Sequence, residues 1–197
     1  MKDVQPLTIQ GPVCELSLLH YLGDGDEVVL VAHPDPRQGG TMLNKVVVSI
    51  AKAYQSMGFH VVTFNYRSVD HKQWQEPEGD VDDARAVFKW LLDRFNKVTD
   101  LVGFSFGSWV VNQLQDQCIG RCLMVAPPIE RYDYAAPLVP TFMLQGCDDE
   151  VVSPEATLMF AKKHTNELRV IPECGHFFHH KLTLVKQWVY DVVKGKA

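Results

Sequence analysis

The chain has 197 residues, of which 46% are hydrophobic and 22% are charged, and its 19 basic and 24 acidic side chains give a net charge of -5 at pH 7. This profile is typical of a single globular domain over residues 1–197, and it excludes a disordered chain and a fibrous repeat. The acidic balance and the lack of a lysine or arginine cluster argue against binding to nucleic acid or to an anionic membrane surface. A small neutral or mildly polar molecule is the expected partner.

The sequence gives no sign of targeting. Its first residues lack the apolar stretch of about 7 to 15 residues that a signal peptide contains, and no run of about 18 apolar residues occurs. We therefore expect a cytoplasmic protein, in which cysteines are free thiols. Cys147 and Cys174 fall on loops that we expect to be neighbours, so an oxidative bridge is the alternative for this pair. The cysteines are Cys14, Cys118, Cys122, Cys147 and Cys174.

Short apolar runs alternate with longer stretches of helical spacing along the chain. Residues 14–21 are expected to form an antiparallel strand that turns back through Gly23–Asp26. Runs that are apolar on both faces predict buried strands at residues 28–32, 59–64, 100–103, 121–125, 141–145 and 168–171. Apolar residues recur at helical intervals over residues 42–57, 81–95, 105–115 and 182–192, which predicts amphipathic helices.

This alternation predicts an α/β fold, a three-layer sandwich in which helices cover both faces of a mostly parallel sheet. In such a sheet, ligands bind at the carboxyl ends of the strands. The connection between residues 125 and 141 is too short to hold an inserted cap domain. We therefore expect an open site.

The sharpest local motif is Gly103-Phe104-Ser105-Phe106-Gly107, which follows a predicted strand and precedes a predicted helix. This G-x-S-x-G pattern is typical of a nucleophile elbow, where a strained turn exposes the serine Oγ and the glycines let strand and helix approach each other. The helix N-terminus there favours a developing oxyanion. The alternative is a glycine-rich turn that only shapes the chain. We predict that Ser105 is a nucleophile.

A serine nucleophile needs a base, and the base needs an acid that fixes its tautomer. Asp148 and Asp149 follow the predicted strand at residues 141–145, and His176 follows the one at residues 168–171. The order serine, aspartate, histidine is the one expected of an α/β-hydrolase sheet. Position alone leaves both aspartates as candidates.

An oxyanion hole needs two backbone N–H donors. One donor is expected from Phe106, directly after the serine, and the other from the loop after the strand at residues 28–32. Pro34 in this loop has no N–H, so Asp35 is the first available donor. The alternative is a turn whose proline and glycine residues only direct the chain.

Over most of its length the chain resembles the small bacterial α/β-hydrolase superfamily proteins, often described as dienelactone-hydrolase-like. The segments that carry the resemblance are His33-Pro34, Gly39-Gly40-Thr41-Met42-Leu43-Asn44-Lys45, Phe64-Asn65-Tyr66-Arg67, Asp82-Asp83-Ala84 leading to Trp90, the G-x-S-x-G motif, Gly146 to Val152, and Gly175-His176-Phe177-Phe178. The resemblance implies an α/β-hydrolase fold without a cap. It also places the acid three residues after Gly146, which implies a catalytic triad of Ser105, Asp149 and His176.

The chain departs from this family pattern in two places. Related proteins continue after the arginine with Arg-Gly-x-Gly-x-Ser, whereas this chain has Arg67-Ser68-Val69-Asp70-His71-Lys72 in a loop that we expect to border the pocket. Dienelactone hydrolase itself uses a cysteine nucleophile, and Ser105 stands at that position here. Its substrate is therefore not carried over.

We expect a serine hydrolase that cleaves a small soluble carboxylic ester through an acyl-enzyme, as a monomer or homodimer. The alternatives are a thioester or peptide bond as substrate, or a catalytically idle α/β-hydrolase fold that serves as a binding protein. No nucleotide-binding motif is present, and no cofactor is expected. His176, His179 and His180 would suit a metal only if their segment were helical, so no metal is expected.

Overall fold

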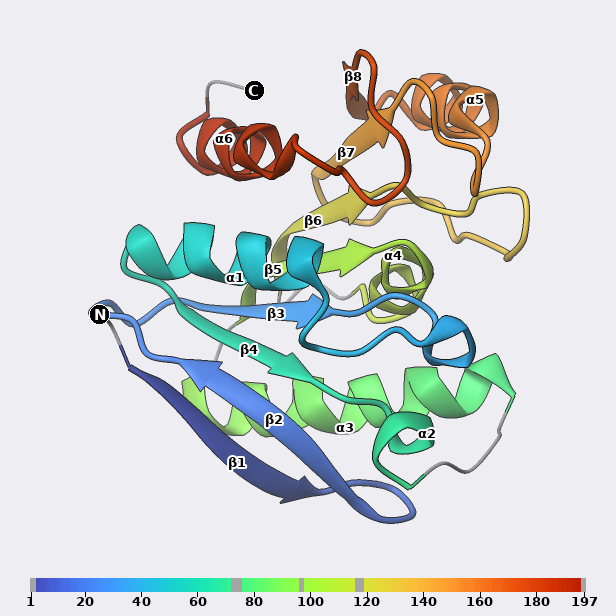
Figure 1. Cartoon of the computed structure of the whole chain (residues 1–197). Helices are drawn as coiled ribbons and strands as arrows, with labels where there is room; N and C mark the ends of the chain where they lie inside the picture. The colour runs from blue at the N-terminus through green and yellow to red at the C-terminus, as the bar shows by residue number, and fades with distance from the viewer. Residues whose placement is uncertain (1–2, 72–75, 96–97, 116–118, 196–197) are drawn as a thin grey trace.

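The structure is a computed structural model, and it describes residues 3–71, 76–95, 98–115 and 119–195. Within these residues the chain forms one eight-stranded sheet with the order β1-β2-β4-β3-β5-β6-β7-β8 (Figure 1). The strands are β1 (Val4–Gln10), β2 (Glu15–Tyr21), β3 (Val28–Ala32), β4 (His60–Phe64), β5 (Val98–Phe104), β6 (Ile119–Val125), β7 (Thr141–Gly146) and β8 (Glu167–Ile171). The helices are η1 (Pro36–Gln38, a 3-10 turn), α1 (Lys45–Ser56), α2 (Arg67–Asp70), α3 (Pro77–Phe95), α4 (Phe106–Asn112), α5 (Pro154–His164) and α6 (Leu182–Val193).

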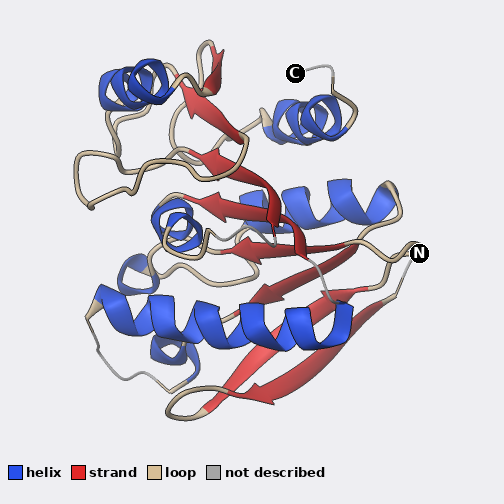
Figure 2. Cartoon of the chain, turned by 180° about the vertical axis from the view of Figure 1, so that it is seen from behind, coloured by secondary structure: helices blue, strands red, loops and turns tan. Residues whose placement is uncertain are grey.

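Helices cover both faces of the sheet, which confirms the predicted three-layer sandwich (Figure 2). The six strands β4, β3, β5, β6, β7 and β8 are parallel to one another. At one edge of the sheet, β2 is antiparallel to both β4 and β1. Val29 and Val31 of β3 pack in the core under α1 and α6, whereas Leu30 and Ala32 face the core under α3, α4 and α5. Because the central strands are buried on two sides, most of their residues are apolar at consecutive positions, as in Val28–Ala32 of β3.

The start of the sheet differs from the sequence-based expectation. β2 is antiparallel as predicted, but it pairs with β1 and β4, not with β3. The unit β3-α1-β4 places β4 beside β3, so the turn at residues 22–27 spans one intervening strand instead of closing a two-stranded hairpin. The chain thus turns back through Gly23–Asp26 as expected, but β2 and β3 are not adjacent in the sheet.

The carboxyl ends of β3, β5, β7 and β8 lie along one edge of the sheet, because these strands are parallel. Residues 126–140, which connect β6 to β7, contain no helix or strand. No cap domain is therefore inserted at this point, as the sequence predicts. None of the helices that the structure describes is long and apolar enough to span a membrane.

A buried ionic network lies nearer the amino end of β5. Asp100 is completely buried, and it accepts hydrogen bonds from Tyr54 Oη at 2.7 Å and from Arg121 Nε and Nη2 at 2.7 and 2.9 Å. Arg121 Nη1 also donates to the carbonyl oxygens of Val192 and Val193 at 3.4 and 3.5 Å, at the end of α6. The network therefore joins α1, β5, β6 and α6.

Candidate active site

Ser105 lies at the carboxyl end of β5, in the tight turn into α4. Its backbone has φ 53° and ψ -123°, a combination that non-glycine residues rarely adopt. A Cβ added to Gly103 would lie 2.2 Å from the Gly107 carbonyl oxygen, and one added to Gly107 would lie 2.4 Å from the Ala32 carbonyl oxygen. The close approach of β3, β5 and α4 therefore requires both glycines of the G-x-S-x-G motif.

His176 reaches Ser105 from the loop after β8. Its Nε2 lies 3.0 Å from Ser105 Oγ, and its Nδ1 lies 2.8 Å from Asp149 Oδ2 in the loop after β7. All three residues are buried: Ser105 is 9% exposed, His176 is 5% exposed and Asp149 is 8% exposed. The structure thus brings together the three side chains that the resemblance selects.

Asp149 is the aspartate that contacts His176, and Asp148 points elsewhere. Asp148 Oδ1 accepts a hydrogen bond from the Cys147 thiol at 2.8 Å. Asp149 Oδ1 accepts from the N–H groups of Val151 and Val152, both at 2.9 Å, so its loop folds around the carboxylate.

Electrostatics keep Asp149 ionised. Burial alone would raise the pKa of Asp149, but the hydrogen bonds from His176, Val152 and Val151 outweigh burial and lower this pKa below its usual value. The buried Gln145, which no sequence motif marks, donates a further hydrogen bond from Nε2 to Asp149 Oδ2 at 2.9 Å. An ionised Asp149 favours the proton on Nδ1 of His176 and leaves Nε2 free to accept one from Ser105.

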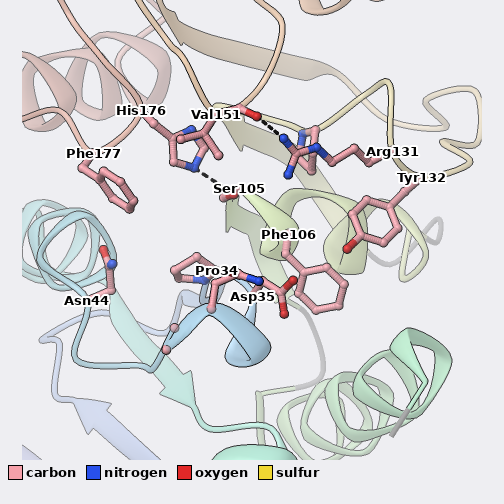
Figure 3. A pocket seen from close by; sticks show the side chains of 14 residues that line it. Pro34, Asp35, Asn44, Ser105, Phe106, Arg131, Tyr132, Val151, His176 and Phe177 are labelled. Carbon is pink, nitrogen blue, oxygen red and sulfur yellow. Dashed lines mark hydrogen bonds between the residues drawn. The ribbon is translucent and has the colours of Figure 1, made fainter.

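A pocket of about 550 Å³ contains Ser105 and His176 (Figure 3). Asn44 and Phe177 lie on one side of Ser105, and Arg131 and Tyr132 lie on the other. The Arg131 guanidinium donates to the Val151 carbonyl oxygen, which joins the loop after β6 to the loop that holds Asp149. The lining residues are Pro34, Asp35, Gln38, Gly39, Gly40, Asn44, Ser105, Phe106, Pro128, Arg131, Tyr132, Val151, His176 and Phe177.

Asp35 and Phe106, the two expected oxyanion donors, both line this pocket. In the part of the chain that the structure describes, neither backbone N–H donates a hydrogen bond to a backbone carbonyl oxygen. Both N–H groups are therefore available to a substrate oxygen. The loop that carries Asp35 is closed by hydrogen bonds from Gln38 N and Gly40 N to the Asp35 carbonyl oxygen, at 3.1 and 2.9 Å.

His33 fixes the peptide that precedes Asp35, and this role is not evident from the sequence. The side chain of His33 is completely buried, and its Nε2 accepts a hydrogen bond from the Tyr66 N–H at 3.4 Å. Nδ1 therefore carries the proton and donates to the Pro34 carbonyl oxygen at 2.6 Å. Burial lowers the pKa of His33 to about 3, so the ring stays neutral near pH 7.

The neutral His33 makes folding stability dependent on pH. Between pH 6.5 and 3 the unfolded chain binds a proton at this ring and the folded chain does not, so stability falls as the pH is lowered. Each pH unit well below 6.5 is expected to remove up to about 1.4 kcal/mol of unfolding free energy through His33. Urea unfolding at pH 7, 6 and 5 measures this slope.

The matched variant for this measurement is His33→Gln, which lacks the titrating group. We expect a shallower slope for His33→Gln than for the wild type. The slope does not vanish, because burial, the neighbouring His60 and Arg94 lower the pKa of His20 to about 4 and act in the same direction. Parallel slopes for the two proteins would show that His33 does not contribute.

The segment after Arg67 does not border the pocket, so that expectation is wrong. Residues 67–70 form α2, and Arg67 donates from its backbone N and from Nε to Asp83 of α3, at 2.8 and 2.7 Å. None of the described residues 67–71 lines the pocket, and Lys72 lies outside the described residues. Because the pair with Asp83 is buried, it anchors α2 against α3 and away from Ser105.

The cluster of His176, His179 and His180 does not share a helix, because α6 begins only at Leu182. Within the described residues, no group of three or more histidine, cysteine, aspartate or glutamate side chains is arranged to hold a metal ion.

The cysteines that the structure describes, Cys14, Cys122, Cys147 and Cys174, are free thiols. The Cys147 sulfur accepts a hydrogen bond from the Glu173 N–H at 3.2 Å, so the loops of Cys147 and Cys174 are neighbours without a bond between the sulfurs. Cys118 lies outside the described residues.

Comparison with known proteins identifies the family, although no family model matches the sequence. The chain is 34% identical over 173 residues to an uncharacterized protein of Rickettsia prowazekii. The matched region covers 78% of this chain and 73% of that protein. Among solved structures, an α/β serine hydrolase without a lid from Xanthomonas campestris is 31% identical, with a TM-score of 0.88 over 98% of this chain and 95% of that one. The chain belongs to the α/β hydrolase family.

A second solved structure supports the assignment of this α/β hydrolase. An α/β serine hydrolase homologue from Coxiella burnetii is 30% identical, with a TM-score of 0.87 over 96% of each chain. Similarity to serine hydrolases along nearly the whole chain supports hydrolase activity for this α/β hydrolase. The connection of residues 126–140 also agrees with the description of the Xanthomonas campestris protein as one without a lid.

Proposed function

We propose that this α/β hydrolase is a serine hydrolase that cleaves small carboxylic esters, with Ser105 as nucleophile, His176 as general base and Asp149 as the acid that orients His176. The observation that carries this proposal is the chain of hydrogen bonds from Asp149 through His176 to Ser105 Oγ, at 2.8 and 3.0 Å, inside a pocket. A protein that only bound a ligand would need neither the strained turn at Ser105 nor a buried base that contacts it.

In the first half of the reaction, His176 Nε2 accepts the Ser105 Oγ proton while Oγ attacks the ester carbonyl carbon. The ionised Asp149 stabilises the resulting imidazolium. The N–H groups of Asp35 and Phe106 donate to the oxyanion of the tetrahedral intermediate. When this intermediate collapses, His176 gives the proton to the leaving alcohol and the acyl group stays on Ser105.

In the second half, water attacks the acyl-enzyme. His176 Nε2 accepts a proton from the water as its oxygen attacks the acyl carbon, and the same proton then returns to Ser105 Oγ. The carboxylic acid leaves and the starting state is restored. These steps need no group beyond the three side chains, two backbone N–H donors and water.

The shape of the pocket supports a small substrate. Its volume is about 550 Å³, and the short connection between β6 and β7 adds no cap above it. The pocket has lining residues on both sides of Ser105, such as Asn44 and Tyr132, so we assign the acyl group to one side and the alcohol to the other. Such a site suits a soluble ester better than a lipid aggregate.

Labelling with a fluorophosphonate tests the proposal, because this reagent phosphonylates an activated serine whatever its natural substrate. We expect a stoichiometric adduct on Ser105 by peptide mass mapping, and none in Ser105→Ala or His176→Ala. Folded wild-type protein without an adduct would contradict the proposed hydrolase and favour a binding protein.

The two neighbouring aspartates provide a matched pair for the same experiment. Asp149→Asn is expected to slow labelling strongly, because the amide no longer favours the productive tautomer of His176. Asp148→Asn should label at the wild-type rate, since Asp148 makes its hydrogen bond with Cys147. The reverse pattern would show that the acid is assigned to the wrong residue.

A further inference from the structure

Arg37 is a nearly buried cation that lies behind the pocket wall without lining it. Its side chain is 12% exposed, and Nε donates to Asp35 Oδ1 at 2.6 Å. The backbone N–H of Arg37 donates to the same oxygen at 2.9 Å. Arg37 therefore holds the Asp35 side chain from two directions.

The same guanidinium also contacts Phe106. Arg37 Cζ lies 4.6 Å from the centroid of the Phe106 ring, within the range of a cation–π interaction. Phe106 directly follows Ser105, and its ring is almost completely buried against Tyr66 and Trp109. One side chain thus contacts both residues whose backbone N–H groups form the proposed oxyanion hole.

A third contact fixes Arg37 to a rigid element. Its Nη1 lies 3.6 Å from Asp80 Oδ2 on α3, and Asp80 is completely buried. The other oxygen of Asp80 accepts a hydrogen bond from Ser68 Oγ at 3.3 Å. The loop that carries Asp35 is therefore connected through Arg37 to α3, which packs against the sheet.

Charge gives Arg37 a second role. The Asp35 side chain is 24% exposed, and Asp35 lines the pocket where an oxyanion forms during acyl transfer. A carboxylate that lines the pocket in which a negative charge develops opposes the transition state unless a cation offsets it. Arg37 Nε, at 2.6 Å, supplies this offset.

From these contacts we propose that Arg37 is a positioning residue of the oxyanion hole. Arg37 holds the backbone N–H donors of Asp35 and Phe106 in the orientation that binds the oxyanion, and it neutralises the Asp35 carboxylate beside them. This inference rests on the proposed function, because it assigns a role within the same reaction. Arg37 itself touches no substrate, so its effect is expected in the transition state and not in substrate binding.

The central test compares Arg37→Gln with the wild type on a soluble ester such as p-nitrophenyl acetate. We expect kcat to fall by about 10- to 100-fold, as misplaced donors stabilise the oxyanion less, while KM changes by less than about twofold. Arg37→Lys keeps the positive charge but loses the planar guanidinium with its several N–H donors. We expect its kcat to lie between those of the wild type and Arg37→Gln. Wild-type kcat in Arg37→Gln would overturn the proposal.

A double variant tests the charge. Asp35→Asn keeps the backbone N–H and removes the carboxylate, so Asp35→Asn combined with Arg37→Gln is expected to have a higher kcat than Arg37→Gln alone. A kcat no higher in the double variant would overturn the proposed neutralisation. Arg94→Gln is the matched control, since Arg94 lies over the Trp90 ring at 5.0 Å but does not line the pocket. Its kcat should equal that of the wild type.

Failure of the proposed function is recognised separately, because the wild type and Ser105→Ala would then hydrolyse the ester equally. In that case backbone order parameters of the Asp35 and Phe106 amides, from NMR relaxation, decide the role of Arg37 without turnover. Lower order parameters at both amides in Arg37→Gln, but not in Arg94→Gln, support the positioning role. Unchanged order parameters overturn it.

Discussion

Replacement of either Ser105 or His176 by alanine is expected to lower kcat for ester hydrolysis by about 10³-fold or more, with a much smaller change in KM. Ser105→Ala removes the attacking oxygen, and His176→Ala removes the base that lies 3.0 Å from it. The remaining rate reflects the oxyanion donors and substrate binding alone. Steady-state kinetics with a chromogenic ester measures both constants.

Two further variants make this result diagnostic. Ser105→Ala combined with His176→Ala should be no slower than either single variant, because groups that act as one unit are not additive. His180→Asn is the matched control: His180 is exposed and has φ 59°, a conformation that asparagine tolerates. A single variant that keeps more than a tenth of wild-type kcat would contradict the assigned roles.

The largest loss of stability is expected from Asp100→Ala, far from the chemistry. The change leaves the Arg121 guanidinium and the Tyr54 hydroxyl without their buried acceptor. Breaking a buried ion pair by removing one partner typically costs about 3–5 kcal/mol, and less where the remaining charge reaches water, as Arg121 does with its side chain 23% exposed. We therefore expect the free energy of unfolding to fall by about 3 kcal/mol in urea titrations at pH 7.

An exposed ion pair provides the comparison. Asp82 and Arg85 on α3 are also linked at 2.7 Å, but their side chains are 58% and 55% exposed. Asp82→Ala should change stability by less than about 1 kcal/mol, because water screens this pair. Equal effects of Asp82→Ala and Asp100→Ala would show that burial does not determine the contribution of Asp100.

The sequence predicts most clearly the strands that are buried on both faces of the sheet and the helices that pack one face on it. The strands from β3 to β7 each contain a run of consecutive apolar residues, and the helices α1, α3 and α6 each carry a clear apolar stripe. These two patterns distinguish buried strands from amphipathic helices. The sequence does not predict β1, because only Ile9 of this strand is buried. It does not predict α5 either, since this helix buries just Thr157, Phe160 and Ala161 and its apolar stripe is weak.

Some residues of the candidate site can be predicted from local sequence motifs, and others cannot. Ser105 is marked by two glycines in a strand-to-helix turn, a local requirement that the sequence displays. The choice of Asp149 over Asp148 came from the family resemblance, because both follow the same strand. The parts played by His33 and Arg37 depend on contacts between segments far apart in the chain, from Tyr66 to His33 and from Arg37 to Phe106 and Asp80, and local patterns do not encode these. Gln145 lies only four residues before Asp149, but no sequence motif marks the hydrogen bond between them.

The backbone conformation of Ser105 implies a trade-off between stability and activity. A non-glycine residue at φ 53° and ψ -123° destabilises the folded state by about 1–3 kcal/mol. Glycine at this position would relieve that strain and remove the nucleophile at the same time. An acyl-transfer enzyme therefore has to keep a serine where glycine would be more stable. The sheet beneath the turn, with a hydrophobic core on each of its two faces, supplies the stability that makes this strain tolerable.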